Sequence, residues 1–230
     1  MGQLRPAPVA VVQARMTSTR LPGKVLAELA GVPALHLQLG RLAECRELAG
    51  VVVATSTDPS DDAVVAAAAA VSIRVVRGPL DDVLGRYAIA ARELGAKGLV
   101  RLTADCPVIA PEVVDEVVRR WREGDERYVA NVIEPRTYPV GMDTEVMDAD
   151  ALLAADAEAT EAYDREHVTP WVRANPERFP QAAVRLDPPA ADVRLTLDTP
   201  EDLEALRRVV ELAGRDAGLE DLIAAARARA

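Results

Sequence analysis

The sequence predicts an α/β fold, with a doubly wound, mostly parallel sheet that is covered by helices on both faces. Two observations carry this prediction: short β-branched runs alternate with helical segments through the first half of the chain, and the connections between them are short. Strands joined through helices run parallel, and a parallel sheet is covered on both faces. The chain has 230 residues and is 50% hydrophobic, so a single domain over residues 1–230 can bury its own core.

The first expected strand is the β-branched run at residues 8–14, which is short and ends in a polar loop. Runs of the same kind predict three further strands, at residues 50–56, 73–76 and 97–103. Since these four strands are separated by helical segments, we expect them to lie parallel in one sheet.

The expected helices each carry their own signal. Residues 32–45 have the apolar period of a helix, and residues 58–70 open with an acidic, serine-containing turn that suits a helix N-terminus. Carboxylates open the segment 81–95, and Gly95 closes it. The segment 111–124 begins with proline and ends with glycine, which is the usual asymmetry of helix ends.

The alternation loosens between residues 128 and 192. The runs at 128–132 and 143–148 predict strands, and residues 164–175 predict a helix that a proline interrupts. Antiparallel pieces inserted into the main sheet would explain this region. Residues 192–214 then return to a strand, a turn and a helix.

Composition excludes several classes of function. The formal net charge of −10 argues against non-specific binding to nucleic acid or to an anionic membrane, both of which need a basic surface. The apolar run at 63–71 is far too short to span a bilayer, and the N-terminal apolar run is too short for a signal peptide. Cys45 and Cys106 do not suggest a disulfide framework, so we expect a cytoplasmic protein.

A cationic loop follows the first expected strand, in the sequence VVQARMTSTRLPGK at residues 11–24. Arg15, Arg20 and Lys24 lie in it, with no acidic residue before Glu28. Ligands of such sheets bind beyond the carboxyl ends of the strands, where loop cations and N–H groups can meet phosphate. The spacing is not that of a Walker A loop. A solvated basic loop is the alternative when these cations are considered alone.

The motif VQARMTSTRLPGKVLAELAGVP resembles the N-terminal motif of the CTP-dependent sugar-acid cytidylyltransferases, which include the CMP-sialic acid and CMP-Kdo synthetases. Gln13 before Ala14 and Arg15 fits the spore-coat polysaccharide group of that family best. The resemblance continues in order through nearly the whole chain, in the segments ATSTDPSDD, VVRGPLDDVLGRY, RLTADCPVIAPEVVDEVV, YPVGMDTEVMDADAL, DREHVTPWV and RLTLDTPEDLEALR.

The resemblance implies a Rossmann-like nucleotidyltransferase fold, in which residues 128–192 form a small antiparallel insertion for acceptor binding and dimerisation. It implies a homodimer, with Trp171 and Val172 in the arm. It also implies the site residues: for the nucleotide Ala14, Arg15, Arg20, Lys24 and Arg77; for the acceptor Asp143, Glu145, Glu166 and His167; for Mg²⁺ Asp105 and Asp198; and for catalysis Arg15, Lys24 and Asp105.

The two metal candidates each have a plainer explanation. Asp105 and Asp198 are short acidic side chains at strand ends, and hard carboxylate oxygens suit Mg²⁺ beside a triphosphate. Asp105 could instead form the turn before Pro107, and Asp198 could cap the helix that follows it. His167 likewise could be a helix histidine packed at a dimer interface.

The expected activity is the transfer of CMP from CTP to a sugar acid or a similar small anionic acceptor, with release of pyrophosphate. Two alternatives stay open. One is a nucleotidylyltransferase for a sugar-1-phosphate or phosphonate acceptor, although the double-glycine opening common in the former is absent. The other is a nucleotide-binding protein without turnover.

Overall fold

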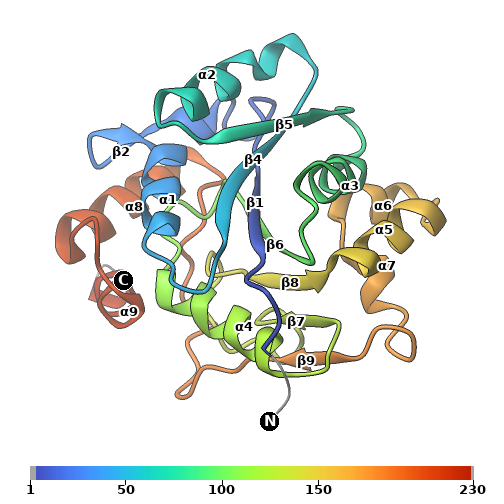
Figure 1. The fold of residues 1–230 in the computed structure, drawn as a ribbon. Coiled ribbons are helices and arrows are strands. Elements are labelled where there is room, and N and C mark those ends of the chain that lie inside the picture. Colours follow the sequence, from blue (N-terminus) through green and yellow to red (C-terminus); the bar gives the residue numbers. More distant parts are fainter. Residues whose placement is uncertain (1–3, 229–230) are drawn as a thin grey trace.

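The computed structural model describes residues 4–228 and is built on one central sheet (Figure 1). The sheet has seven strands in the order β5-β4-β1-β6-β8-β7-β9. Their bounds are β1 Val9–Gln13, β4 Gly50–Ser56, β5 Arg74–Gly78, β6 Gly98–Thr103, β7 Tyr128–Ala130, β8 Glu145–Asp148 and β9 Gln181–Ala183. Strands β5, β4, β1 and β6 run parallel, and β8 is antiparallel to both β6 and β7. The predicted fold class, including its antiparallel piece, is confirmed.

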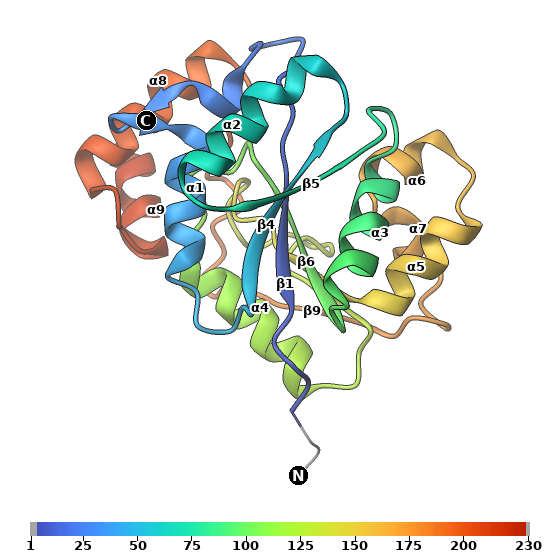
Figure 2. The same ribbon diagram turned by 45° about the horizontal axis from the view of Figure 1, so that its top comes forward.

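Helices form a layer on each face of the sheet (Figures 1 and 2). One layer holds α1 Ala34–Ala43, α2 Asp62–Ala70, α4 Pro111–Glu123, α8 Pro200–Ala213 and α9 Leu219–Ala228. The other holds α3 Val83–Leu94, α5 Ala149–Glu158, α6 Ala162–His167 and α7 Pro170–Arg173. Two 3₁₀ turns, η1 Lys24–Leu26 and η2 Pro59–Asp61, and a short hairpin of β2 Glu28–Leu29 and β3 Val32–Pro33 complete the fold.

The core divides between the two faces because successive strand residues point to opposite sides. In β1, Ala10 and Val12 pack in the cluster that also contains α1 and α4, whereas Val11 packs in the cluster under α3. Within residues 4–228 every helix is too short or too polar to cross a membrane.

Two local expectations are corrected. The helix expected at 32–45 begins only at Ala34, because Val32 and Pro33 pair with β2. The strand expected after residue 192 is reduced to one bridge, between Arg194 and Val140. Leu197 there donates its N–H to the carbonyl of Asp105 at 2.8 Å, so this segment bonds to a loop and extends no sheet.

Candidate active site

A pocket of about 880 Å³ opens at the carboxyl ends of β1 and β6. Its wall includes the loop after β1, the residues that follow β6, part of α3, the end of α6, and Asp198. The volume lies in the range of small-molecule sites, and the position is the ligand side of a doubly wound sheet. The cationic loop therefore lies where the sequence analysis expects a ligand.

The glycine turn at the end of the cationic loop returns Lys24 to this pocket. Gly23 adopts a φ of +71°, a left-handed conformation that side chains disfavour. Its N–H donates to the carbonyl of Met16 at 3.0 Å, and the N–H of Lys24 donates to Leu21 at 3.1 Å. The loop is thus closed on itself, and the Lys24 side chain points toward the strand ends.

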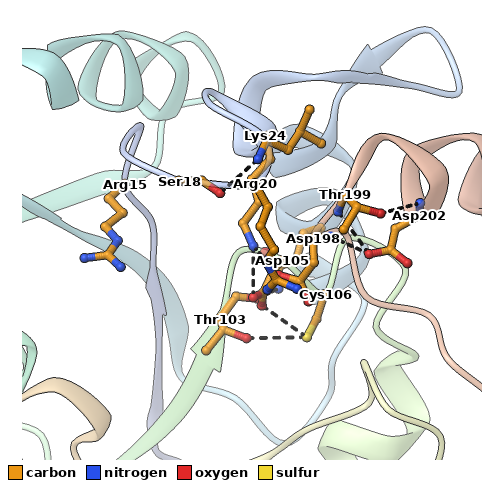
Figure 3. Close-up of polar contacts among 12 residues, drawn as sticks. Arg15, Ser18, Arg20, Lys24, Thr103, Asp105, Cys106, Asp198, Thr199 and Asp202 are labelled. Atoms are coloured by element: carbon orange, nitrogen blue, oxygen red, sulfur yellow. Dashed lines mark hydrogen bonds and ion pairs between the residues drawn. The ribbon is translucent and has the colours of Figure 1, made fainter. Parts of the chain in front are cut away.

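Lys24 joins the two predicted metal ligands (Figure 3). Its Nζ atom lies 3.2 Å from Oδ2 of Asp105 and 2.8 Å from Oδ1 of Asp198. Arg20 also contacts Asp198, at 2.9 Å, and Arg194 does so at 2.6 Å. Burial opposes the charge of Asp198, but these cations outweigh it and hold the pKa of its carboxyl below the ordinary value.

The helix cap after Asp198 is made by other residues. Thr199 Oγ1 accepts the N–H of Asp202 at 3.2 Å, and the Asp202 carboxylate accepts the N–H of Thr199 at 3.0 Å, which forms a capping box. The Asp198 side chain takes no part in this cap and is left for the cations of the pocket.

Asp61 is a structural anchor of the cationic loop that the sequence analysis did not single out. It lies in the acidic turn that predicts a helix N-terminus, where Asp58 does cap η2. Its buried carboxylate instead accepts the N–H of Met16 at 2.7 Å, together with the N–H and the hydroxyl of Ser56. Within the acidic run DPSDD, nothing in the sequence distinguishes this carboxylate from its neighbours.

Arg15 lies to one side of the Lys24 group (Figure 3), where it meets Glu166 of α6. Its guanidinium is 4.0 Å from the carboxylate of Glu166, and the Arg15 side chain is 47% exposed. His167 follows on the same helix, and its ring contacts that of Tyr163 at a tilt of 55°, with the centroids 4.4 Å apart. Arg15, Glu166 and His167 all line the pocket, so two of the predicted acceptor residues meet the cationic loop.

Three other predicted site residues do not line this pocket. Arg77 donates to the carbonyls of Ser56 and Asp58 and pairs with Asp62. Asp143 is held by both arms of Arg136, at 2.6 and 3.0 Å. Glu145 is buried against Arg101. Direct ligand contact by Arg77, Asp143 and Glu145 stays a prediction.

The protein supplies only part of the oxygen ligands that a hard divalent cation would need at this site. Asp105 and Asp198 supply carboxylate oxygens, while residues 4–228 contain no group of three or more acidic, histidine or cysteine side chains that could enclose a metal. Mg²⁺ commonly takes one or two carboxylates and completes its shell with phosphate and water, so the two fit it. Burial, with the charge of Asp105, raises the pKa of the Cys106 thiol, which disfavours a thiolate nucleophile.

The chain is also similar to known proteins. The family profile described as cytidylyltransferase matches residues 9–222. The chain is 32% identical over 226 residues to the spore coat polysaccharide biosynthesis protein SpsF of Bacillus subtilis (strain 168), covering 93% of this chain and 91% of that protein. It is 37% identical over 111 residues to the 3-deoxy-manno-octulosonate cytidylyltransferase of Geobacter sulfurreducens, covering 47% of this chain and 43% of that protein. A solved structure of a cytidylyltransferase from Leptospira borgpetersenii superposes with a TM-score of 0.91 at 31% identity, covering 98% of this chain and 95% of that one.

Proposed function

The chain belongs to the cytidylyltransferase family, and from that premise we propose that it transfers CMP from CTP to a hydroxyl group of a small anionic acceptor. Pyrophosphate is the second product. The observation that supports this most is the folding of the cationic loop over Asp105 and Asp198, which brings phosphate-binding cations and metal-binding carboxylates to one pocket.

Arg15, Arg20 and Lys24 bind the triphosphate in this proposal. Ala14, which is buried where the loop begins, places Arg15 directly beyond β1. The charge-assisted hydrogen bonds of the three cations stabilise phosphate oxygens as negative charge shifts toward the leaving pyrophosphate. Lys24 and Arg20 also pair with Asp198, so a bound phosphate competes with that carboxylate for them.

Asp105 and Asp198 would hold Mg²⁺, which when bound supplies charge neutralisation at the phosphates. The remaining steps need positioning and no covalent intermediate on the protein. Glu166 and His167 line the pocket beside Arg15, and we assign them to the acceptor, with His167 able to accept a proton from the attacking hydroxyl.

The decisive experiment offers the protein a choice of nucleotides and acceptors. CTP, UTP, ATP and GTP are each incubated with Mg²⁺ and a panel of sugar acids, phosphonates and sugar-1-phosphates, and products are read by mass spectrometry and pyrophosphate release. CMP attached to an acid supports the proposal. Product from a phosphonate or a sugar-1-phosphate alone supports the alternative acceptor class. CTP binding without any product supports a binding protein.

We also propose a cytoplasmic homodimer. Both cysteines are free thiols, which persist in a reducing compartment. Val172 is fully buried within its own chain, so a dimer would be formed by other parts of residues 128–192, such as α6, where Tyr163 is 65% exposed. Light scattering at micromolar concentration should give twice the chain mass, and a monomer would contradict this part of the proposal.

A further inference from the structure

The face of the pocket under α3 carries three polar side chains that have no part in the triphosphate assignment. Gln13 ends β1, Arg101 lies on β6, and Arg86 lies on α3; we call these three the pocket floor. Gln13 is paired with Thr103 in the sheet, and Thr103 lies two residues beyond Arg101. Because strand side chains alternate between faces, Arg101 and Thr103 point to the same side of the sheet.

Arg101 is held in place by a residue of the neighbouring strand β8. It stands directly opposite Glu145 in the antiparallel pairing of β6 with β8, and its Nη1 atom donates to Oε1 of that carboxylate. The hydroxyl of Tyr128, which is fully buried, donates to Oε2. Glu145 therefore accepts from both sides, and its side chain is only 5% exposed. The guanidinium of Arg101 is thus fixed at the pocket by two buried side chains, Glu145 and Tyr128, that do not line the pocket themselves.

The floor has hydrogen-bonding capacity that the protein does not use. Arg86 is 2% exposed, and its Nη1 atom donates to the carbonyls of Pro79 and Leu80 at 2.6 and 2.8 Å. Within the described part of the chain, the Nε atoms of Arg86 and Arg101 and the Oε1 atom of Gln13 have no partner. Buried polar atoms without partners are uncommon in folded proteins, and three of the six in the described residues lie in this one pocket wall, which supports a ligand there.

The charges of the floor indicate the sign of that ligand. Arg101 is balanced by Glu145, whereas Arg86 makes no ion pair with any residue between 4 and 228. Burial, together with the charge of the nearby Arg15, lowers the pKa of Arg86. An anion bound beside Arg86 would stabilise the charged form of its guanidinium.

We infer that the pocket floor is a second oxyanion subsite, distinct from the triphosphate cations, in which Arg86 and Arg101 bind the charged group of the acceptor. Glu145 and Tyr128 are positioning residues that act through Arg101. This inference rests on the proposed function. The floor faces the same pocket as Glu166 and His167. Lys24, Asp105 and Asp198 form a second group of charges in that pocket.

The experiment measures anion binding after the nucleotide subsite has been filled. Protein is saturated with α,β-methylene-CTP and Mg²⁺ and titrated calorimetrically with three carboxylate probes: 3-deoxy-manno-octulosonate, N-acetylneuraminate and tartrate. The methyl ester of whichever acid binds tests whether the charge matters. The central variant is R101Q/E145Q, which removes the guanidinium without leaving Glu145 buried and unpaired.

A matched control is R122Q/E47Q, which exchanges a partly buried arginine–glutamate pair in the same way but lies outside the pocket. We expect at least one acid to bind the loaded wild-type protein and the control, and the ester to bind at least about tenfold more weakly. R101Q/E145Q should lose about 10- to 100-fold in affinity for that acid and keep its nucleotide affinity within about twofold.

The other possible outcomes would overturn either the subsite alone or the proposed function together with it. Equal binding of acid and ester, full acid binding by R101Q/E145Q, or no binding of any carboxylate to the loaded protein overturns the subsite. A selective loss of nucleotide affinity in R101Q/E145Q assigns the floor to the cytosine base instead and also overturns it. Failure of the wild-type protein to bind the nucleotide analogue would overturn the proposed function itself, and the subsite with it.

Discussion

The ammonium of Lys24 lies 2.8 Å from Oδ1 of Asp198, and the same nitrogen reaches Asp105. A residue from the loop after the first strand thus links two carboxylates from distant parts of the chain. A lysine ammonium is compact and mobile on its stem, so it can leave this pair for a phosphate. This arrangement suits the binding of a phosphate to Lys24 together with a metal ion to the two carboxylates.

Replacing Lys24 with methionine tests two roles of its ammonium, which are to bind phosphate and to pair with the carboxylates of Asp105 and Asp198. Lys24→Met keeps the length of the side chain and removes its charge, so the affinity for CTP should fall by about 10- to 100-fold, the scale of one charge-assisted hydrogen bond. Without nucleotide, Mn²⁺ should bind the variant more tightly than the wild type, because the ammonium no longer competes for the carboxylates. Calorimetry measures the first effect and electron paramagnetic resonance the second.

The chain offers a matched control in Lys97, which is exposed and does not line the pocket. Lys97→Met should bind CTP and Mn²⁺ as the wild type does. Unchanged CTP affinity in a folded Lys24→Met protein would place the triphosphate elsewhere.

Asp61 tests whether the cationic loop depends on a single buried anchor. Its carboxylate accepts from three donors, whereas the amide of asparagine has only one acceptor oxygen. Asp61→Asn should therefore lower the free energy of unfolding by about 1–3 kcal/mol and weaken CTP binding as well. Asp62→Asn is the control, since that carboxylate is 66% exposed and its surface pair contributes about 1 kcal/mol or less. Wild-type CTP affinity in Asp61→Asn would show that the loop holds its shape without the anchor.

The sequence predicted the parallel half of the sheet well because its signals are local. Valine runs, a proline at Pro111 and a glycine at Gly95 mark element ends, and the structure places α4 and α3 accordingly. Helix α5 and strand β9 were not predicted. Helix α5 lacks an amphipathic pattern, and β9 is only three residues that pair with β7.

The site residues also divide into those that local sequence signals predict and those whose contacts depend on the tertiary fold. The loop motif and the aspartates at strand ends could be named from the sequence, because their position after a strand decides where they lie. Arg101 and Glu145 could not be paired, since their contact depends on the register between β6 and β8. Asp61 looked like a helix cap because a carboxylate before a helix is common there.

Glu145 predicts a difference in acid stability. Burial alone would raise its pKa, but the charge of Arg101 and the hydrogen bond from Tyr128 outweigh burial and keep the pKa below the ordinary value of 4.5. A lowered pKa contributes stability that is fully present above the unfolded value and is lost as the pH falls through the folded one. Denaturant unfolding of the wild type should thus weaken more steeply below about pH 4.5 than that of R101Q/E145Q. Parallel pH profiles for the two proteins would contradict the buried charge.

The final prediction separates metal binding by Asp105 and Asp198 from the turn and cap roles that their positions also suggest. Asparagine keeps the size and turn preference of aspartate and removes its charge. The cap of α8 is preserved in Asp198→Asn, because Thr199 and Asp202 make it. We therefore expect Asp105→Asn and Asp198→Asn to melt near the wild type, to lose about 100-fold or more in turnover, and to need more Mg²⁺ for the remainder. Asp192→Asn, an exposed carboxylate paired with Arg227, controls for the loss of one charge and should keep full activity. Wild-type turnover at ordinary Mg²⁺ concentration in either site variant would remove that residue from the metal site and return it to a structural role.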